Sequence, residues 1–397
     1  MTKKLILIGI SLIIAFAGAR NVMPTRREMN QLEIVRIMGV DKTDNGNIEV
    51  TWVRNYSNTE GGGAEPIDEE DGGESEDDDG AEGTEVAAAD PGNTISRTGP
   101  TVSAAINEIR RAMEREVLAS HIEYILIGES AAREDIFKFL DYLSRDSDAR
   151  LSARVYFVQD GSARELLTQL PPNFALADKL QNVGRNSGAS AISTEMTLAD
   201  FFRKLSSDSG DGLVPNVKLT EAGGQTAAEL GGYTVVANRK FAGLMGATAA
   251  AGNNLIQQNS PIGYINLRHD ESERHISVRI SDFNTRINFD FDGWELERIR
   301  ITTNARGTVS EAQIHAYTYE LERIANMLFR EQIAEAVELS RRYQSDFLGF
   351  GERLRLQHPY RWSRIQPDWR EFLATVQIYV VVNTEIEQTH SIARGRS

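Results

Sequence analysis

Histidine side chains are the first residues of this sequence that could bind a metal ion or act as a catalytic base. The six histidines are His121, His269, His275, His315, His358 and His390. None forms an H-E-x-x-H pattern or an i, i+4 pair, the spacings that place two imidazoles on one face of a helix. His269 and His275 are six residues apart, near the ends of a predicted strand pair, and could share a metal. Isolated histidines are more often surface or half-buried residues, so the sequence predicts no metal site.

The acidic run at residues 60–90 invites comparison with a calcium-binding loop, because it contains fourteen Asp or Glu and no Lys or Arg. Aligning Gly80 with the sixth position of an EF-hand loop puts Ser75 first and Val86 twelfth, where acidic ligands are required. The pattern fails at both ends. The run is rich in Gly, Ala and acid and has only two large apolar residues, which predicts a disordered acidic insertion.

No residue of the sequence lies in a motif that is known to activate a catalytic nucleophile. It has no cysteine, which removes thiolate catalysis and Cys-based metal sites. No serine lies in G-x-S-x-G, and Ser162-Ala163-Arg164-Glu165 predicts a capping box at a helix start. Gly349-Phe350-Gly351 and Gly231-Gly232 lack the spacing of a phosphate loop and are predicted to be turns. We therefore assign no catalytic residue, no cofactor-binding residue and no metal ligand, and predict that the chain is not an enzyme.

The length and net charge of the chain limit the classes of protein to which it can belong. The 397 residues are enough for two or three domains, and the hydrophobic content of 41% is enough for buried cores. The formal net charge is −15, of which residues 60–90 supply −14, so the rest of the chain carries only −1. Outside the acidic run, Lys and Arg do not outnumber Asp and Glu, so the chain lacks the excess positive charge that binds a phosphate backbone. This excludes nucleic acid as a partner.

The N-terminus carries the only long uncharged apolar run. Leu5 to Ala19 follows Lys3 and Lys4 and ends on small residues, which together form the three parts of an export signal. At about 1.5 Å per residue this run would make a helix of roughly 22 Å, short of a bilayer core of about 30 Å. Residues 1–19 are predicted to be a signal peptide or membrane anchor, with the rest of the chain outside the cytoplasm and close to a membrane.

Alternating helix and strand patterns continue to residue 205. Predicted strands lie at residues 31–41, 48–56, 122–127 and 151–158, and predicted helices begin near Val102, Ser130, Ser162 and Thr197. The second helix is predicted to have an inner face formed by Ile136, Phe139, Leu140 and Leu143. Asn45-Gly46 is a hairpin signal between the first two strands. This order predicts an N-terminal α/β domain over residues 20–205, with helices packed on a sheet.

Two further domains are predicted after the turn-rich residues 206–212. The middle domain, residues 206–275, is predicted to have short strands at 214–219, 232–237 and 261–267. The C-terminal α+β domain, residues 276–397, is predicted to have strands at 276–283, 286–291, 296–303 and 376–382. Its long helix is predicted to be capped at Ser310 and to run to about Tyr343. The fold class is therefore α+β, with three mixed α/β domains behind an N-terminal hydrophobic signal or anchor.

The predicted long helix also carries an apolar face. Its members recur every three or four residues and are Ile314, Tyr317, Leu321, Ile324 and Leu328. This spacing predicts a face that packs in a core or a domain interface, and the alternative is a groove for a partner helix.

Several short motifs, taken in order, resemble those of a known family. Near the N-terminus these are Arg27-Glu28-Met29, Leu32, Ile34-Val35 and Gly39-Val40-Asp41. A second stretch has His121, Ile125-Leu126-Ile127-Gly128-Glu129, Ala132-Arg133, Asp146, Arg150-Leu151, Gly161, Ala163 and Glu165-Leu166-Leu167. Near the C-terminus these are Asp346-Phe347-Leu348-Gly349-Phe350-Gly351 and Pro359-Tyr360-Arg361-Trp362. Together they resemble the Ger(x)C family, the C subunits of spore nutrient-germinant receptors, from Arg26 to about Ile386 outside the acidic insertion.

The resemblance implies a non-enzymatic subunit of a membrane-associated germinant receptor, which acts in nutrient-triggered germination as a scaffold or signalling component. It implies a place on the outer face of the spore inner membrane, beside two membrane subunits of the A and B types. It also implies a lipoprotein, and here the chain departs. Phe16-Ala17-Gly18 matches the first three lipobox positions, but Ala19 stands where the lipid-bearing cysteine is required. The sequence thus predicts a non-lipidated variant, either anchored by its apolar run or cleaved after Ala19.

An extracytoplasmic solute-binding or hydrolytic protein is the alternative function. That class requires a pocket with convergent polar groups or a catalytic set, and the sequence indicates neither. Tight binding or turnover of a nutrient by the purified soluble domain would favour this alternative.

We predict that the acidic insertion is dispensable for folding. Deleting Glu60 to Asp90 and joining the ends by a short Gly/Ser turn should leave the melting temperature within a few degrees of the wild-type value. The physical reason is that a longer loop costs only about 0.6 kcal/mol per doubling of its length, so shortening it changes stability little. A collapse of folding, measured by circular dichroism, would show that the segment is structural.

Overall fold

The structure is a computed structural model that describes most of the chain after its N-terminal segment. The described residues are 32–54, 94–113, 115–146, 149–171, 175–182, 193–207, 209–258, 263–268, 274–312 and 317–388. The predicted signal or anchor and the acidic insertion lie outside these ranges. Within them, no helix is both long enough and apolar enough to cross a membrane.

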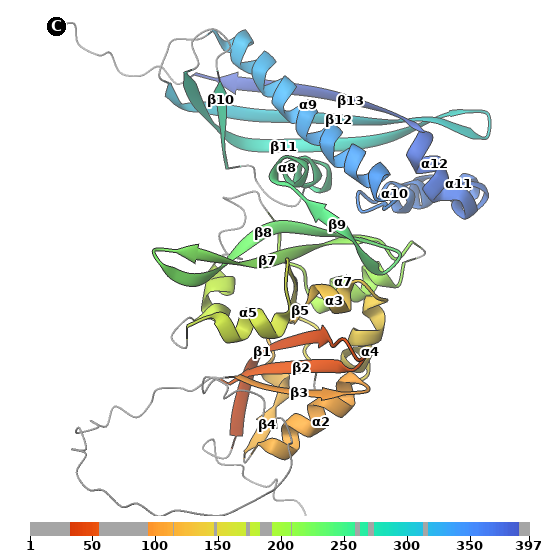
Figure 1. Ribbon diagram of the computed structural model, residues 1–397. Coiled ribbons are helices and arrows are strands. Elements are labelled where there is room, and N and C mark those ends of the chain that lie inside the picture. Colours follow the sequence, from red (N-terminus) through yellow and green to blue (C-terminus); the bar gives the residue numbers. More distant parts are fainter. Residues whose placement is uncertain are drawn as a thin grey trace, which may run out of the picture.

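Two β-sheets organise the described chain (Figure 1). The first sheet has the order β3-β2-β1-β5-β6-β7-β8-β9, with β4 paired to the start of β1. Its strands are β1 (Leu32–Lys42), β2 (Ile48–Arg54), β3 (Thr94–Gly99), β4 (Glu116–Leu118), β5 (Tyr124–Ile127), β6 (Arg154–Val158), β7 (Gly212–Ala222), β8 (Gln225–Ala237) and β9 (Lys240–Met245). The second sheet has the order β10-β11-β12-β13 and consists of β10 (Tyr264–Arg268), β11 (His275–Asp292), β12 (Glu295–Ala312) and β13 (Gln377–Glu387).

Helices cover both faces of the first sheet. One face packs on α2 (Val102–Ala112), α4 (Ile136–Arg145) and α7 (Leu198–Leu205), and the opposite face packs on α5 (Ala163–Gln169). The short helices α3 (Glu129–Ala132) and η2 (Ala119–His121) complete this half. Because the central parallel strands are covered on both faces, they are continuous apolar runs, and all four residues of β5 are buried.

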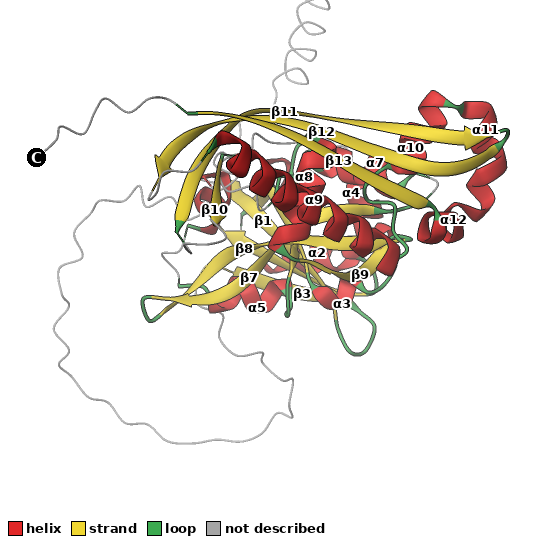
Figure 2. Cartoon of the chain, turned by 90° about the horizontal axis from the view of Figure 1, so that it is seen from above, coloured by secondary structure: helices red, strands yellow, loops and turns green. Residues whose placement is uncertain are grey.

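The second sheet is covered on one face only. Helix α9 (Thr318–Arg342) runs along this face, as Figures 1 and 2 show, and α8 (Ala247–Gln257) lies between α9 and the first sheet. Burial therefore alternates along β11 and β12, which is the pattern of strands with one solvated face. One end of the sheet meets α10 (Phe350–Gln357), α11 (Pro359–Ile365), η3 (Gln366–Asp368) and α12 (Trp369–Thr375).

Most predicted elements of the first half are present. The first two strands, the α2 helix and the inner face of α4 are confirmed, since Ile136, Phe139, Leu140 and Leu143 are all buried. Ser162 caps α5 through the N–H of Glu165, and Thr197 caps α7 through the N–H of Asp200. Ser130 is predicted to cap the second helix, but it lies inside α3. Asp135 caps α4 instead.

The second half differs more from the prediction. The predicted strands at 276–283 and 286–291 are one continuous strand, β11, because β12 pairs with it along almost its entire length. Ser310 does not start the long helix; it lies in β12, whose Ala312 pairs with Ile276 at the far end of the ladder. Helix α9 begins at Thr318 with Tyr317 as its N-cap.

The predicted role of the apolar face of α9 in a core is confirmed for its described members. Leu321 and Ile324 are buried, and Leu328 is half-buried against the same core. Ile314 lies outside the described residues, and Tyr317 is exposed at the start of the helix.

The first sheet continues across the predicted domain boundary near residue 206. Strand β7 pairs in parallel with β6, and β8 and β9 extend the same sheet. Strands β7 and β8 have 11 and 13 residues, so they are longer than predicted. The described residues thus form two sheets in a mixed α+β fold, and the division into three domains stays a prediction.

The close crossing of α8 and α9 generates a test of the packing between the two halves. A Cβ at Gly252 would lie 2.8 Å from Ile333 N and closer still to the Gln332 carbonyl. Gly252→Ala should therefore destabilise the protein by about 1–3 kcal/mol, although alanine favours a helix. Gly246→Ala is the control, since nothing lies within 4 Å of its added Cβ. Equal melting temperatures for the two variants would contradict the close approach.

Candidate functional site

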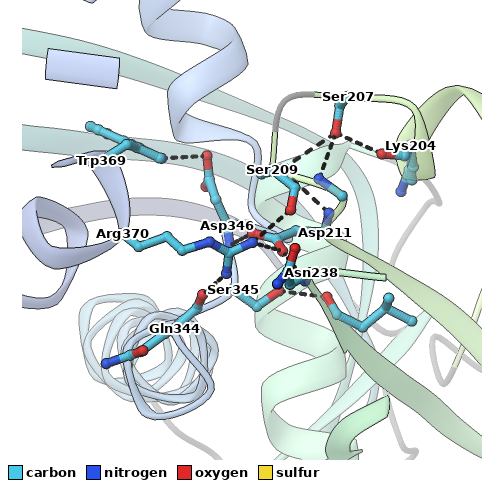
Figure 3. Close-up of polar contacts among 12 residues, drawn as sticks. Lys204, Ser207, Ser209, Asp211, Asn238, Gln344, Ser345, Asp346, Trp369 and Arg370 are labelled. Atoms are coloured by element: carbon cyan, nitrogen blue, oxygen red, sulfur yellow. Dashed lines mark hydrogen bonds and ion pairs between the residues drawn. The ribbon is translucent and has the colours of Figure 1, made fainter. Parts of the chain in front are cut away.

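The two halves of the protein are joined where the start of β7 meets the helices at the end of the second sheet. Figure 3 shows the polar side chains that gather there, with Asp211 and Asp346 at the centre. We call this group the joint cluster, and it consists of Asp211, Asn238, Gln344, Ser345, Asp346, Trp369 and Arg370. Its members come from segments next to the first sheet and from segments next to the second sheet. The cluster is therefore a polar link between the two sheets.

Asp211 immediately precedes β7, and its side chain is 0% exposed. One carboxylate oxygen, Oδ1, accepts the backbone N–H of Asn238 at 2.8 Å and the Arg370 guanidinium at 2.6 Å. The other, Oδ2, accepts the backbone N–H of Asp346 at 2.9 Å. A buried carboxylate needs such donors, because an unpaired charge in the interior is very costly. Here the donors come from three separate segments.

Asp346 lies in the loop between α9 and α10. Its Oδ1 accepts the N–H of Phe350 at 2.9 Å, and its Oδ2 accepts the N–H of Gly351 at 2.7 Å and the Trp369 indole N–H at 3.0 Å. Gly349, with φ of +71°, lets the chain turn back so that these N–H groups reach the carboxylate. Asp346 thus satisfies the otherwise unpaired N–H groups that open α10.

Arg370 on α12 completes the joint cluster. Its guanidinium donates to Asp211, to the carbonyl of Ser209 at 2.6 Å and to the carbonyl of Gln344. One side chain therefore ties α12 to the segment before β7 and to the α9–α10 loop. Nearby, Ser345 donates its hydroxyl to the Val236 carbonyl at 2.8 Å, which adds a direct link to β8.

Burial dominates the electrostatics of both aspartates. It raises the pKa of Asp346 to about 6, against the lowering effect of the three donors, and the nearby Asp211 charge raises it further. Burial also raises the pKa of Asp211, while its hydrogen bonds and Arg370 lower it. Arg370 is paired with Asp211, whereas within the described residues Asp346 accepts hydrogen bonds from neutral donors only.

A third aspartate with a raised pKa, Asp41, is buried in the first sheet. Asp41, at the end of β1, accepts the N–H groups of Ala163 at 2.8 Å and Arg164 at 2.9 Å. Burial raises its pKa to about 6 despite these bonds. A Cβ at Gly128 would collide with Asp41 Oδ1, and one at Gly39 would lie 2.9 Å from Ala163 Cβ. This aspartate therefore fixes the start of α5 against the sheet.

A cavity of about 340 Å³ opens beside the joint cluster, between α7 and the helices α10 to α12. Asp211, Asp346 and Trp369 contribute to its wall. The joint cluster is thus adjacent to a space large enough for a small molecule.

Catalytic chemistry finds little support in the described ranges. They hold no group of three or more His, Asp or Glu side chains that could bind a metal ion. Asp41, Asp211 and Asp346 all accept hydrogen bonds from backbone N–H groups, which is a structural use of a carboxylate. No catalytic role follows from this arrangement.

The histidines and glycine pairs that the sequence analysis considers lie apart from one another. His275 opens β11 opposite Arg268, whereas its possible metal partner His269 is outside the described residues, as is the acidic run. The His358 ring packs edge-on against Phe291 at 5.0 Å, as a structural aromatic contact. Gly349 lies in the predicted turn before α10, but Gly232 does not lie in a turn. It sits in β8 with φ of +108°, where the register with β7 shifts.

Local sequence patterns do not predict the joint cluster. Asp346 stands in a family-like motif, and Asp211 stands in a turn-rich segment. Nothing local to Arg370 predicts that it reaches a residue 159 positions earlier in the chain. The only usable signal was an acidic residue at the start of a buried strand.

Two family models match the chain in succession. Residues 25–219 match the model described as spore germination protein N-terminal domain. Residues 231–390 match the model described as spore germination B3/GerAC like, C-terminal. The boundary between the two matches falls at the turn end of the β7–β8 hairpin, whereas the joint cluster lies at its open end.

Individual relatives agree with these models. The chain is 25% identical to spore germination protein YndF of Bacillus subtilis (strain 168), which covers 74% of this chain and 73% of that protein. It is 22% identical to spore germination protein KC of the same organism, over 92% of this chain and 91% of that protein. The crystal structure of the GerBC protein is similar with a TM-score of 0.55 and 16% identity, over 88% of this chain and 96% of the other.

The buried aspartates predict that the folded protein gains stability on mild acidification. Folded Asp346 takes up a proton near pH 6, whereas in the unfolded chain it does so only near 4, so protonation favours the folded state between these values. The free energy of unfolding should rise by roughly 1 kcal/mol from this residue as the pH falls from about 7 to about 5.

Chemical denaturation at several pH values measures this effect. Asp346→Asn should lower stability at every pH and flatten the gain, whereas Asp282→Asn, on an exposed position of β11, should leave the slope unchanged. A slope in Asp346→Asn identical to that of the wild type would refute the assignment.

Proposed function

The chain belongs to the GerAC family of spore germination proteins, and from this premise we propose that it is the C subunit of a membrane-associated germinant receptor. The observation that carries the proposal is the pair of family models matched in order over residues 25–219 and 231–390. A relative named spore germination protein KC matches over 92% of the chain, so the whole body and not one domain supports the assignment.

We infer a non-enzymatic role, as a scaffold or signalling component in nutrient-triggered germination. The support is that the buried acids of the described residues act as acceptors for backbone and side-chain donors, in positions that fix segments to one another. The joint cluster links the first sheet to the second through several ionic and polar bonds. A subunit that transmits a change of position needs such a link between its parts.

The proposed place is the outer face of the spore inner membrane, beside membrane subunits of the A and B types. The apolar run at residues 5–19 would direct export or serve as the anchor. Strand β1, which follows this run, lies at the end of the molecule remote from the second sheet (Figure 1). An anchor there would leave the second sheet away from the bilayer, where partner subunits can reach it.

A solute-binding function remains the second candidate, and one observation favours it. The cavity beside the joint cluster has polar and aromatic walls and a volume of about 340 Å³, at the small end of ligand sites. A hydrolytic function has no comparable support among the described side chains.

The proposal is tested by isolating the intact complex from spore membranes. An affinity-tagged chain should co-purify with A-type and B-type subunits, and deleting its gene should abolish germination in response to at least one nutrient. Normal germination with every nutrient in the deletion strain, or a chain that co-purifies with neither subunit, would refute the receptor role.

The joint cluster should be needed for this assembly. Arg370→Met removes the guanidinium that faces the enclosed Asp211 carboxylate, and removing one partner of a buried pair costs about 3–5 kcal/mol. We expect less Arg370→Met chain in spore membranes and correspondingly less recovered complex. Arg330→Met, on the exposed side of α9, is the matched control and should behave as the wild type. Undiminished recovery of the Arg370→Met complex would contradict this role for the joint cluster.

A further inference from the structure

The cavity beside the joint cluster has charged walls whose groups are unequally compensated. Its charged side chains are Arg203, Lys204 and Arg355 on the basic side and Asp211, Asp346 and Glu352 on the acidic side. Serine hydroxyls and two tryptophans, Trp362 and Trp369, complete much of the remaining wall. These charged groups differ in whether they already have a partner.

The two enclosed acids are already satisfied. Asp211 accepts three donors, including Arg370, and Asp346 accepts three donors of its own. Arg203 is paired with Asp200 at 3.0 Å, on the side of α7. None of these three residues needs a ligand to compensate its charge.

Lys204 is different. Its side chain is half-buried and lies over Gly212, where a Cβ would be 3.2 Å from Lys204 Cδ. Its ammonium group makes no ion pair or hydrogen bond with any residue that the structure describes; only its backbone carbonyl is engaged, by Ser207. Burial lowers the pKa of Lys204 and the neighbouring Arg203 charge lowers it further, against smaller raising effects of Asp200 and Glu352.

Two further groups on the α10 side of the cavity are also unpaired within the described ranges. Arg355 and Glu352 lie three positions apart on α10, and both are exposed. Glu352 is near enough to Lys204 to raise its pKa, though as the weakest of the causes. The open charges of the cavity are therefore two cations and one carboxylate.

The larger cavity of the described chain is a useful contrast. It has about 800 Å³ and lies over α2 and α4. There, Lys42 is paired with Glu134 and Arg145 with Asp141. These two ion pairs lie on its wall, where Arg110 and Lys138 are exposed to solvent.

We propose that the cavity beside the joint cluster binds a small organic anion that carries one oxyanion group and one hydrogen-bond donor. The oxyanion would lie between Lys204 and Arg355, because an ion pair in a half-buried site is stronger than one in water. The donor would face Glu352, and the apolar part of the ligand would pack on Trp362 and Trp369. This site does not depend on the receptor role of the chain, so either proposal can fail alone.

Three probe molecules of nearly equal size separate these requirements. Lactate has an oxyanion and a hydroxyl group, propionate has the oxyanion alone, and propane-1,2-diol has hydroxyl groups without charge. Each is added to the full chain at constant ionic strength while lysines are acetylated with a trace of acetic anhydride. Peptide mass spectrometry then gives the acetylation rate of Lys204 and of the exposed Lys240, which serves as the internal control.

We expect lactate to slow acetylation of Lys204 several-fold and propionate to slow it less. Propane-1,2-diol should have no effect, and Lys240 should react at one rate throughout. Equal protection of the two lysines, equal protection by lactate and propionate, or protection by the diol would overturn the proposed ligand class. So would the absence of protection of Lys204 at saturating probe concentrations.

A second measurement uses tryptophan fluorescence, because Trp362 and Trp369 line the cavity. Lactate should change the emission of the wild type and of the control Arg330→Met, but not that of Lys204→Met, which keeps the apolar stem and removes the charge. An unchanged lactate response in folded Lys204→Met would overturn the proposal. If that variant fails to fold, the wild-type acetylation experiment still decides.

Discussion

The removal of one buried aspartate, Asp211, and one half-buried aspartate, Asp346, from bulk water at the contact between the sheets is the constraint on which the rest of the architecture depends. Removing a carboxylate from water is costly, and only donors in fixed positions make it tolerable. Asp211 obtains two of its donors from segments more than a hundred residues later in the chain, Asp346 N and Arg370. Asp346 obtains its donors locally, from the start of α10 and from Trp369. A shift of the second sheet against the first would remove two donors from Asp211, the Asp346 N–H and the Arg370 guanidinium, while Asp346 would keep its own. Apolar packing of α8 and α9 sets how closely the halves approach, whereas the joint cluster sets their relative position.

The local chemistry of the sequence predicted local structure well. Caps such as Ser162 and Thr197, and the apolar spacing of α4, depend on residues within one or two turns, so their structure follows from pattern alone. The failures share a different cause. Ser310 has the local signature of a helix cap, yet the β11–β12 ladder extends to Ala312 and keeps it in a strand. Long-range pairing overrode the local preference at that position. The continuity of the first sheet across residue 206 also depends on a long-range contact, the pairing of β6 with β7, which no local pattern records.

The motifs by which the family is recognised have physical explanations in the structure. Gly39 and Asp41 of the first motif meet Gly128 and Ala163 of the second stretch at one point. There the Asp41 carboxylate holds α5, Gly128 leaves room for the carboxylate, and Gly39 leaves room for Ala163. Asp346, Gly349, Gly351 and Trp362 do the same at the start of α10, where a Cβ at Gly351 would be 2.8 Å from the Trp362 ring. Asp41 and Asp346 each have a glycine beside them, Gly128 and Gly351, that leaves room for the carboxylate.

The position of the cavity connects binding with the contact between the halves. Asp211 and Asp346 belong both to the cavity wall and to the joint cluster, so an occupant would alter the field at the two acids that hold the sheets together. An anion beside Lys204 would disfavour ionisation of Asp346, whose pKa of about 6 already lies near the range where its charge changes. Loss of that charge would weaken its bonds to the start of α10 and to Trp369, and it would relieve the repulsion from Asp211. A ligand could therefore bias the joint without touching Arg370, because the same carboxylates serve both places.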